Sequence, residues 1–146
     1  MDMCTYKKVL DFLKSIPTLK EVGLFYLGES ALCKDLATYY KMLKEIGYFT
    51  YLTTNGTIYD SVAAALPYID SLKISWNYSD IFDFKKKTNG TDVQYCNIMQ
   101  NIDKLHELCQ HYNKRLSVST INDGDREKYY AALKQLKYHD HYWIPL

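Results

Sequence analysis

The chain has 146 residues, of which 47% are hydrophobic and 24% are charged, a size and composition typical of one domain with a sizeable core. Its 18 Lys and Arg residues nearly balance 17 Asp and Glu residues, so the formal net charge is +1. This balance excludes the strong electrostatic field that recruits nucleic acid or an anionic membrane.

The four cysteines and the N-terminal residues indicate a compartment. Cys4, Cys33, Cys96 and Cys109 form no Cys-x-x-Cys pair and have no histidine at zinc-finger spacing. The first residues contain no basic region followed by an apolar stretch, and no segment is apolar over the length that spans a bilayer. We therefore expect a cytoplasmic protein with reduced thiols, no metal site of its own and no membrane or nucleic-acid partner.

Helical and extended patterns alternate along the first half of the chain. Apolar residues that recur every three or four positions predict helices, and Pro17 and Gly47 stand where two of them should end. Short apolar runs rich in β-branched and aromatic residues predict strands. The expected elements are helices over 4–16, 34–46 and 59–66, and strands over 21–27 and 49–53.

The same alternation continues in the second half. The clearest pattern is an apolar stripe over residues 92–112, which predicts a long helix. The other expected elements are strands over 71–76, 115–121 and 142–146, and a helix that ends near Leu136. Strict alternation of strands and helices predicts an α/β fold with a parallel sheet and right-handed crossovers.

Polar clusters follow four of the predicted strands. Because ligands of parallel α/β folds gather at the carboxyl ends of the strands, these clusters are expected to share one rim and to form a site. The clusters are Gly28, Glu29 and Ser30; Thr54, Asn55 and Gly56; Ser75 and Asn77; and Ser119, Thr120 and Asn122.

The first cluster attracts attention because a buried strand ends abruptly in a glycine and a carboxylate. Gly28 would allow close approach of a ligand or a backbone, and Glu29 would be held at the strand end. The alternative is that Glu29 is a solvated loop acid and Gly28 only a turn residue. For Thr54, Asn55 and Gly56, a strand-ending turn is favoured over ligand contact.

Residues 77–91 form the longest expected connection. Two phenylalanines stand there among acidic residues and the run of Lys85, Lys86 and Lys87. Connections of this length in a compact domain are often lids or binding loops, and this is the expectation here.

Several of these segments resemble the radical S-adenosylmethionine (SAM) enzymes. Leu27-Gly28-Glu29-Ser30 resembles the Gly-Gly-Glu-Pro stretch that closes their second barrel strand, and Thr54-Asn55-Gly56 resembles their Thr-Asn-Gly turn. The run from Leu72 to Asn77 is similar to their fourth strand, where a serine and a following polar residue approach the ribose. Residues 115–146 are similar to their fifth strand, following helix and sixth strand.

The resemblance has two departures. One glycine and the proline of Gly-Gly-Glu-Pro are missing here. The Cys-x-x-x-Cys-x-x-Cys loop, which supplies three thiolates to the family's 4Fe-4S cluster, is absent as well, and Cys4 stands alone where that loop would end. Cys96 and Cys109 fall on a predicted helix, where packing is the expected role, and Cys33 is the cysteine closest to the rim.

The resemblance implies a fold and a cofactor. The fold would be a partial TIM-like (β/α) barrel of about five parallel strands with helices on the outer face, a single domain over residues 1–146 without the family's first strand. The cofactor would be SAM, with Glu29 on the methionine ammonium, Gly28 beside the methionine, and Ser75 and Asn77 at the ribose. The residues implied for this site are Gly28, Glu29, Ser30, Ser75, Asn77, Ser119 and Asn122.

Two hypotheses about function remain open. In the family, a reduced 4Fe-4S cluster cleaves SAM to a 5'-deoxyadenosyl radical that abstracts a substrate hydrogen. The first hypothesis is a partial radical SAM domain, inactive alone and with no catalytic residue of its own, that works within a longer chain. The second is a non-catalytic α/β module, a truncated or decayed remnant that binds SAM or another nucleotide or a partner. A missing first strand would leave a sheet edge open to self-association or a partner chain.

Overall fold

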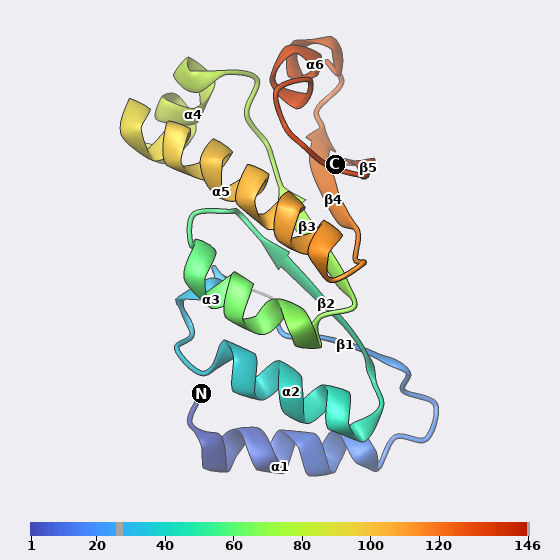
Figure 1. Ribbon diagram of the computed structural model, residues 1–146. Coiled ribbons are helices and arrows are strands. Elements are labelled where there is room, and N and C mark those ends of the chain that lie inside the picture. Colours follow the sequence, from blue (N-terminus) through green and yellow to red (C-terminus); the bar gives the residue numbers. More distant parts are fainter. Residues whose placement is uncertain (26–27, 146) are drawn as a thin grey trace.

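A computed structural model describes residues 1–25 and 28–145, in which five parallel strands form one sheet in the order β1-β2-β3-β4-β5 (Figure 1). The strands are β1 (Glu21–Gly23), β2 (Phe49–Thr54), β3 (Ser71–Ser75), β4 (Leu116–Asn122) and β5 (Asp140–Pro145). A doubly wound sheet reverses its strand order, whereas here each crossover adds the next strand on the same side, as in a barrel. The expected α/β partial barrel of about five parallel strands is confirmed.

The helices of the first two thirds of the chain pack on one face of this sheet. In Figure 1, α1, α2, α3 and α5 lie on the same side of the strands. The helices are α1 (Met3–Lys14), α2 (Leu36–Ile46), α3 (Tyr59–Ala65), α4 (Ile81–Thr88), α5 (Asp92–His111) and α6 (Glu127–Leu133), with short 3₁₀ turns η1 (Ser30–Leu32) and η2 (Leu66–Tyr68). None of the described helices combines the length and the apolar character needed to cross a membrane.

The two faces of the sheet differ in chemistry. Alternate strand residues such as Leu52, Leu72 and Val118 are fully buried and belong to the core beneath the helices. The residues between them face the other way and are largely polar: Tyr51 and Thr53 on β2, Ser71, Lys73 and Ser75 on β3, and Ser117 on β4. The interior of a TIM barrel is normally packed with bulky branched side chains, so this polar inner face indicates a site.

The first strand is shorter than the sequence predicts. The expected strand over 21–27 is regular only over Glu21–Gly23, and residues 26 and 27 lie outside the described part. The buried hydroxyl of Tyr40 explains the early end, because it accepts a hydrogen bond from the Leu24 N–H (3.2 Å) and donates to the Tyr51 carbonyl (2.8 Å). A side chain thus replaces the backbone bond that would have continued the ladder. The expectation that this edge pairs with another chain stays a prediction.

The expected loop over 77–91 is wrong, because its middle is the helix α4. The Asp80 side chain caps this helix by accepting a hydrogen bond from the Asp83 N–H (2.8 Å), and Asn89 ends it in the left-handed conformation (φ 54°). Among the residues of α4, only Phe84 is buried, so the helix lacks the apolar stripe by which sequence patterns are found.

Candidate functional site

Glu29 lies between the end of β1 and the end of β2, and its carboxylate accepts three hydrogen bonds. Its Oε1 accepts from the Ala31 N–H (3.0 Å) and the Thr54 hydroxyl (2.7 Å), and its Oε2 accepts from the Asn55 N–H (2.8 Å). The interpretation of Glu29 as a solvated loop acid is therefore wrong. A carboxylate has about four acceptor positions, of which the described residues use three, so they leave one position on Oε2 open to a ligand.

A cavity of about 260 Å³ opens beside Glu29 at the carboxyl ends of the strands. Three of the predicted site residues, Gly28, Glu29 and Ser75, line it together. Gly28 has a φ of +87°, which favours glycine, and a side chain there would meet open space. The complete lining is Phe25, Gly28, Glu29, Thr53, Thr54, Asn55 and Ser75.

Thr53 is a member of this site that the sequence did not reveal. Its Oγ1 is buried and has no hydrogen-bond partner among the described residues. Buried hydroxyl groups almost always have a partner, so an orphaned one in a cavity wall fits a site that receives a polar ligand. Its neighbours Thr54 and Asn55 form the predicted strand-ending turn, yet they line the cavity too.

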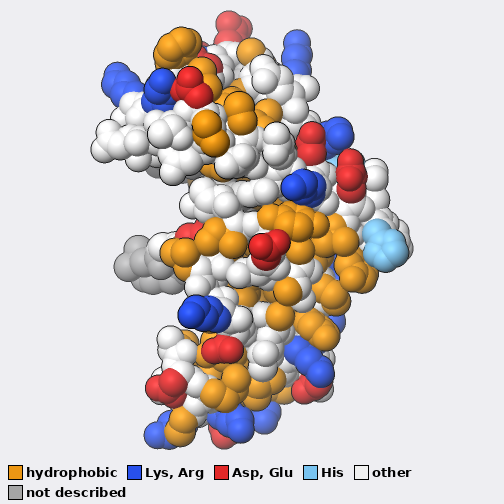
Figure 2. Space-filling model, turned by 60° about the vertical axis from the view of Figure 1, so that its left-hand side comes forward, with side chains coloured by type: hydrophobic (Ala, Val, Ile, Leu, Met, Phe, Trp, Pro, Cys, Tyr) orange, Lys and Arg blue, Asp and Glu red, His pale blue; other side chains and the backbone are white. Residues whose placement is uncertain are grey.

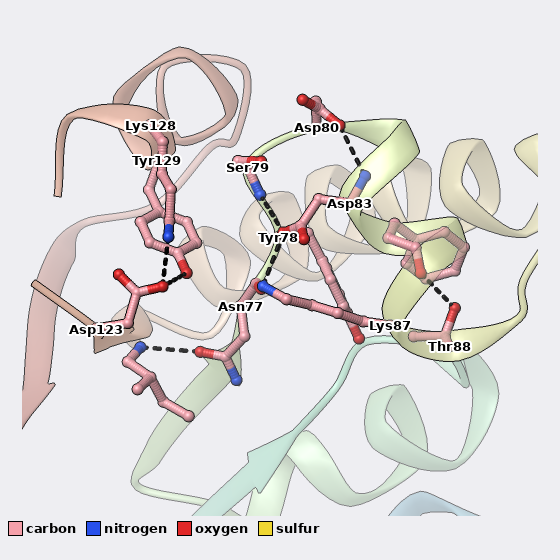
Figure 3. Close-up of polar contacts among 12 residues, drawn as sticks. Asn77, Tyr78, Ser79, Asp80, Asp83, Lys87, Thr88, Asp123, Lys128 and Tyr129 are labelled. Atoms are coloured by element: carbon pink, nitrogen blue, oxygen red, sulfur yellow. Dashed lines mark hydrogen bonds and ion pairs between the residues drawn. The ribbon is translucent and has the colours of Figure 1, made fainter. Parts of the chain in front are cut away.

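Asn77 positions Ser75 and joins the ends of β3 and β4. Its amide Nδ2 donates to the Ser75 hydroxyl oxygen (3.2 Å). Its Oδ1 accepts from the Ile121 N–H (2.9 Å), and Figure 3 marks this bond at the Asn77 side chain. The Lys87 ammonium of α4 donates to the Asn77 carbonyl and to Asp83, each at 2.8 Å. Burial alone would raise the pKa of Asp83, but the hydrogen bonds from Lys87 and the Ser79 N–H outweigh it and lower the pKa.

The remaining predicted residues do not line this cavity. Ser30 donates to the Leu24 carbonyl (2.6 Å) and Asn122 accepts from the Gly124 N–H (3.3 Å), so both stabilise turns. Ser119 is buried in the sheet with its hydroxyl 3.5 Å from the Ile74 carbonyl oxygen. Ligand contact by these three residues stays a prediction, as does contact by Asn77, whose side chain is occupied by Ser75 and Ile121.

The inner face of the sheet carries a second hollow, of about 370 Å³, below the rim. Lys73 projects into it from the middle of β3, in register with Thr53 and Ser117, and forms no ion pair with another described residue. In the sequence, the polar residues Ser71, Lys73 and Ser75 alternate with the apolar residues Leu72 and Ile74, and this pattern indicates a strand with one polar and one apolar face. The complete lining is Glu21, Phe49, Tyr51, Leu52, Thr53, Ser71, Lys73, Ser117 and Tyr142.

The cysteines do not fit a 4Fe-4S cluster. In the ranges 1–25 and 28–145, no three Cys, His, Asp or Glu residues form a group that could hold a metal. Cys4 and Cys96 are exposed, whereas Cys109 is on the buried face of α5, where burial raises the pKa of its thiol to about 11. Cys33 lines an apolar hollow with Tyr6 and Tyr39.

Comparison with solved structures identifies the architecture. The structure of TYW1 with a lysine-pyruvate adduct bound superimposes with a TM-score of 0.70 and 21% identity, covering 97% of this chain and 48% of that one. The crystal structure of archaeal TYW1 superimposes with a TM-score of 0.63 and 22% identity, covering 93% of this chain and 48% of that one. TYW1 is a radical SAM enzyme. The chain has a radical SAM-like fold.

The likeness to TYW1 is one of fold. This chain spans about half the length of each TYW1 chain, 48% in both comparisons. No family model and no curated protein sequence matches it. The assignment of ligand and chemistry therefore rests on the residues of the site.

Proposed function

We propose that this chain is the SAM-binding portion of a radical SAM domain. The observation that carries the proposal is the cavity at the carboxyl ends of the strands, where Gly28, Glu29 and Ser75 meet. These are three of the positions to which the resemblance gave ligand contacts, and they come from strands separated by more than one helix. The radical SAM-like fold supports the same conclusion.

Each residue of the cavity has a defined task in this proposal. The open acceptor position on Glu29 Oε2 receives the methionine ammonium of SAM in a charge-assisted hydrogen bond. Gly28 lets the methionine approach the backbone, and the Ser75 hydroxyl, oriented by Asn77, bonds a ribose hydroxyl. The Thr53 hydroxyl gains a partner when a polar group of the ligand displaces the neighbouring side chains slightly.

The described residues fit SAM but not the iron-sulfur cluster, so we assign no radical step to this chain. When bound, the reduced cluster supplies the electron that cleaves SAM, and its ligands have to come from a longer chain or a partner. The residues of this chain bind SAM, orient it and exclude water from it.

Isothermal titration calorimetry with SAM tests the proposal. We expect saturable binding that Glu29→Gln weakens about tenfold or more, because the substitution removes a charge-assisted contact while its amide oxygen can still accept from the Ala31 N–H and the Thr54 hydroxyl. Glu45→Gln, on the exposed face of α2, is the matched control and should bind like the wild type. No heat of binding, or equal affinity in both variants, would favour the non-catalytic interaction module instead.

The lysine-pyruvate adduct of TYW1 suggests a task for Lys73. We propose that the Lys73 amine captures the carbonyl carbon of a small substrate in the inner hollow. The neutral amine adds to the carbonyl and water leaves, which gives an imine. Ser117 lies beside it in register and supplies a hydroxyl group for the carboxylate of a keto acid.

Reductive trapping tests the proposed imine formation by Lys73. Incubation with pyruvate and cyanoborohydride should add one reduced pyruvate to the chain, and peptide mass spectrometry should place it on Lys73. Lys73→Arg keeps the charge but cannot form an imine, so it should abolish the adduct, whereas Lys134→Arg on the exposed surface should not. Label spread over surface lysines would contradict the assignment.

A further inference from the structure

A further hollow, of about 320 Å³, lies outside the rim of the sheet. It is bounded by the loops after β2 and β3, by α4 and by the first turns of α5, and Figure 2 shows this side of the molecule hollowed beneath the lobe that α4 and α5 form. Asn55 lines both this hollow and the cavity beside Glu29. The complete lining is Asn55, Thr57, Tyr78, Phe84, Thr88, Gly90, Gln94, Asn97 and Ile98.

The wall of this hollow is aromatic and fixed. The rings of Tyr78 and Phe84 meet edge to face at 5.0 Å between centroids, and Tyr78 packs in the same way on Trp76 at 5.3 Å. Gly90 leaves room for the Phe84 ring, because a Cβ at this position would lie 2.5 Å from a ring carbon. Such a wall presents a preformed surface to a flat ligand.

Several hydrogen-bonding groups of the lining are unused. The Asn55 Oδ1 accepts from the Thr57 N–H (2.9 Å) and hydroxyl (2.6 Å), so the Asn55 amide is oriented. Its Nδ2 donates to no other residue in the described part of the chain and can donate to a ligand. The Tyr78 hydroxyl and the Asn97 amide bond no other described residue, and Figure 3 shows the Tyr78 hydroxyl directed toward the loop after β2. Burial raises the pKa of Tyr78, so its hydroxyl keeps its proton at neutral pH.

The lining carries no charged side chain among its described residues, although three lysines stand nearby on α4. An anionic group would therefore meet no counter-charge inside the hollow. A flat, neutral ring with donors and acceptors on its edge matches the aromatic wall and the amide and hydroxyl groups together. The volume is at the lower end of the roughly 300–1,000 Å³ of ligand sites, which suits one ring system and no more.

We propose that this hollow is a second binding site, separate from the SAM cavity, that holds the neutral heterocycle of a nucleoside. The ring lies against Tyr78 and Phe84, and its edge bonds the Asn55 Nδ2, the Tyr78 hydroxyl and the Asn97 amide. Because the Asn55 N–H is bonded to Glu29, the bound ring lies next to the rim cavity and faces whatever that cavity holds.

Saturation-transfer NMR with adenosine, guanosine, cytidine and uridine tests this site on the whole chain. At least one nucleoside should bind saturably, and Tyr78→Phe and Asn97→Leu should each weaken it about three- to tenfold, the loss expected for one or two neutral hydrogen bonds. Gln110→Leu removes an exposed amide at the other end of α5 and should change nothing. Thermal unfolding of each variant shows that a loss of binding is not a loss of folding.

Three results would overturn the proposal. They are the binding of no nucleoside, equal binding by Tyr78→Phe, Asn97→Leu and the wild type, and much tighter binding of the 5'-monophosphates, which would place the ligand on the lysines of α4. The proposal does not depend on SAM, so an excess of SAM should leave nucleoside affinity unchanged. Competition between SAM and the nucleoside would show that the hollow is part of the SAM site and would also overturn it.

Discussion

The rim of the sheet has two halves that use similar residues differently. At the ends of β1 and β2, Glu29 accepts three hydrogen bonds and still faces a cavity. At the ends of β3 and β4, Asp123 is paired with Lys128 and accepts from the Tyr129 hydroxyl (3.0 Å), and Asp83 is paired with Lys87. The Lys87 ammonium also lies 5.7 Å from the centre of the Tyr129 ring and so connects α4 with α6.

The comparison shows that polar residues at strand ends do not by themselves make a site. In the β3–β4 half, each charge is satisfied by another side chain of the protein, which holds α4 and α6 over the strands (Figure 3). In the β1–β2 half, the carboxylate keeps an open acceptor position and a buried hydroxyl stays unpaired among the described residues. Unused hydrogen-bonding capacity beside a cavity distinguishes the binding half from the structural half.

The largest expected effect is that of Glu29→Ala on stability. The substitution leaves the Ala31 and Asn55 N–H groups and the Thr54 hydroxyl without their acceptor, and we expect the free energy of unfolding to fall by about 3 kcal/mol. Urea denaturation followed by circular dichroism measures the loss. Glu29→Gln keeps an oxygen for the Ala31 N–H and the Thr54 hydroxyl and loses the acceptor of the Asn55 N–H, so it should lose less stability than Glu29→Ala. An unchanged midpoint for Glu29→Ala would mean that these bonds are absent in solution.

Tyr40→Phe should have the next largest effect, about 2 kcal/mol, because it removes the bridge between Leu24 and Tyr51 and leaves both backbone groups unpaired. Burial raises the pKa of Tyr40 above its ordinary value of 10.0. The stability due to the neutral hydroxyl is therefore fully present below pH 10 and decreases above it. Denaturation curves at neutral and alkaline pH should show this decrease in the wild type and less of it in Tyr40→Phe.

The structural half of the rim should weaken in acid. The hydrogen bond from Lys128 holds the pKa of Asp123 at about 2, below its ordinary value of 3.8. Because the pKa is lowered in the folded state, the contribution of Asp123 is present above pH 3.8 and is lost as the pH falls toward 2. Asp123→Asn should flatten the acid branch of a stability profile over this interval, and identical profiles for both proteins would show that the pair is not formed.

The smallest expected effects compare Ser75, which ends β3 but lines the cavity beside Glu29, with the ion pair that follows β4. Ser75→Ala removes one neutral hydrogen bond to the ribose and should weaken SAM binding about two- to tenfold. Lys128→Met breaks the pair with Asp123 in the structural half and should change SAM affinity less than twofold. Calorimetry at neutral pH compares them, and a larger loss in Lys128→Met would mean that both halves contact the ligand.

The sequence predicted the alternation of the elements and three residues of the cavity. Helix and strand periods are local properties, so the stripe over 92–112 and the alternating strands could be recognised without coordinates. Gly28, Glu29 and Ser75 were found because they directly follow or end predicted strands, whose carboxyl ends must meet at one rim. The helix α4 was missed because a single buried phenylalanine gives no period.

Only the tertiary structure decided which hydrogen-bonding groups are already occupied. The Asn77 Oδ1 accepts a hydrogen bond from the N–H of Ile121, 44 residues away. The Tyr40 hydroxyl ends β1 early because it bonds the Leu24 N–H and the Tyr51 carbonyl. Such partners depend on how the helices pack against the sheet, because burial makes every unpaired polar group costly and the packing determines which groups can meet. The sequence therefore determined which residues stand at the strand ends, whereas the packed structure determined that Glu29, Thr53 and Lys73 keep hydrogen-bonding groups that the other described residues do not use.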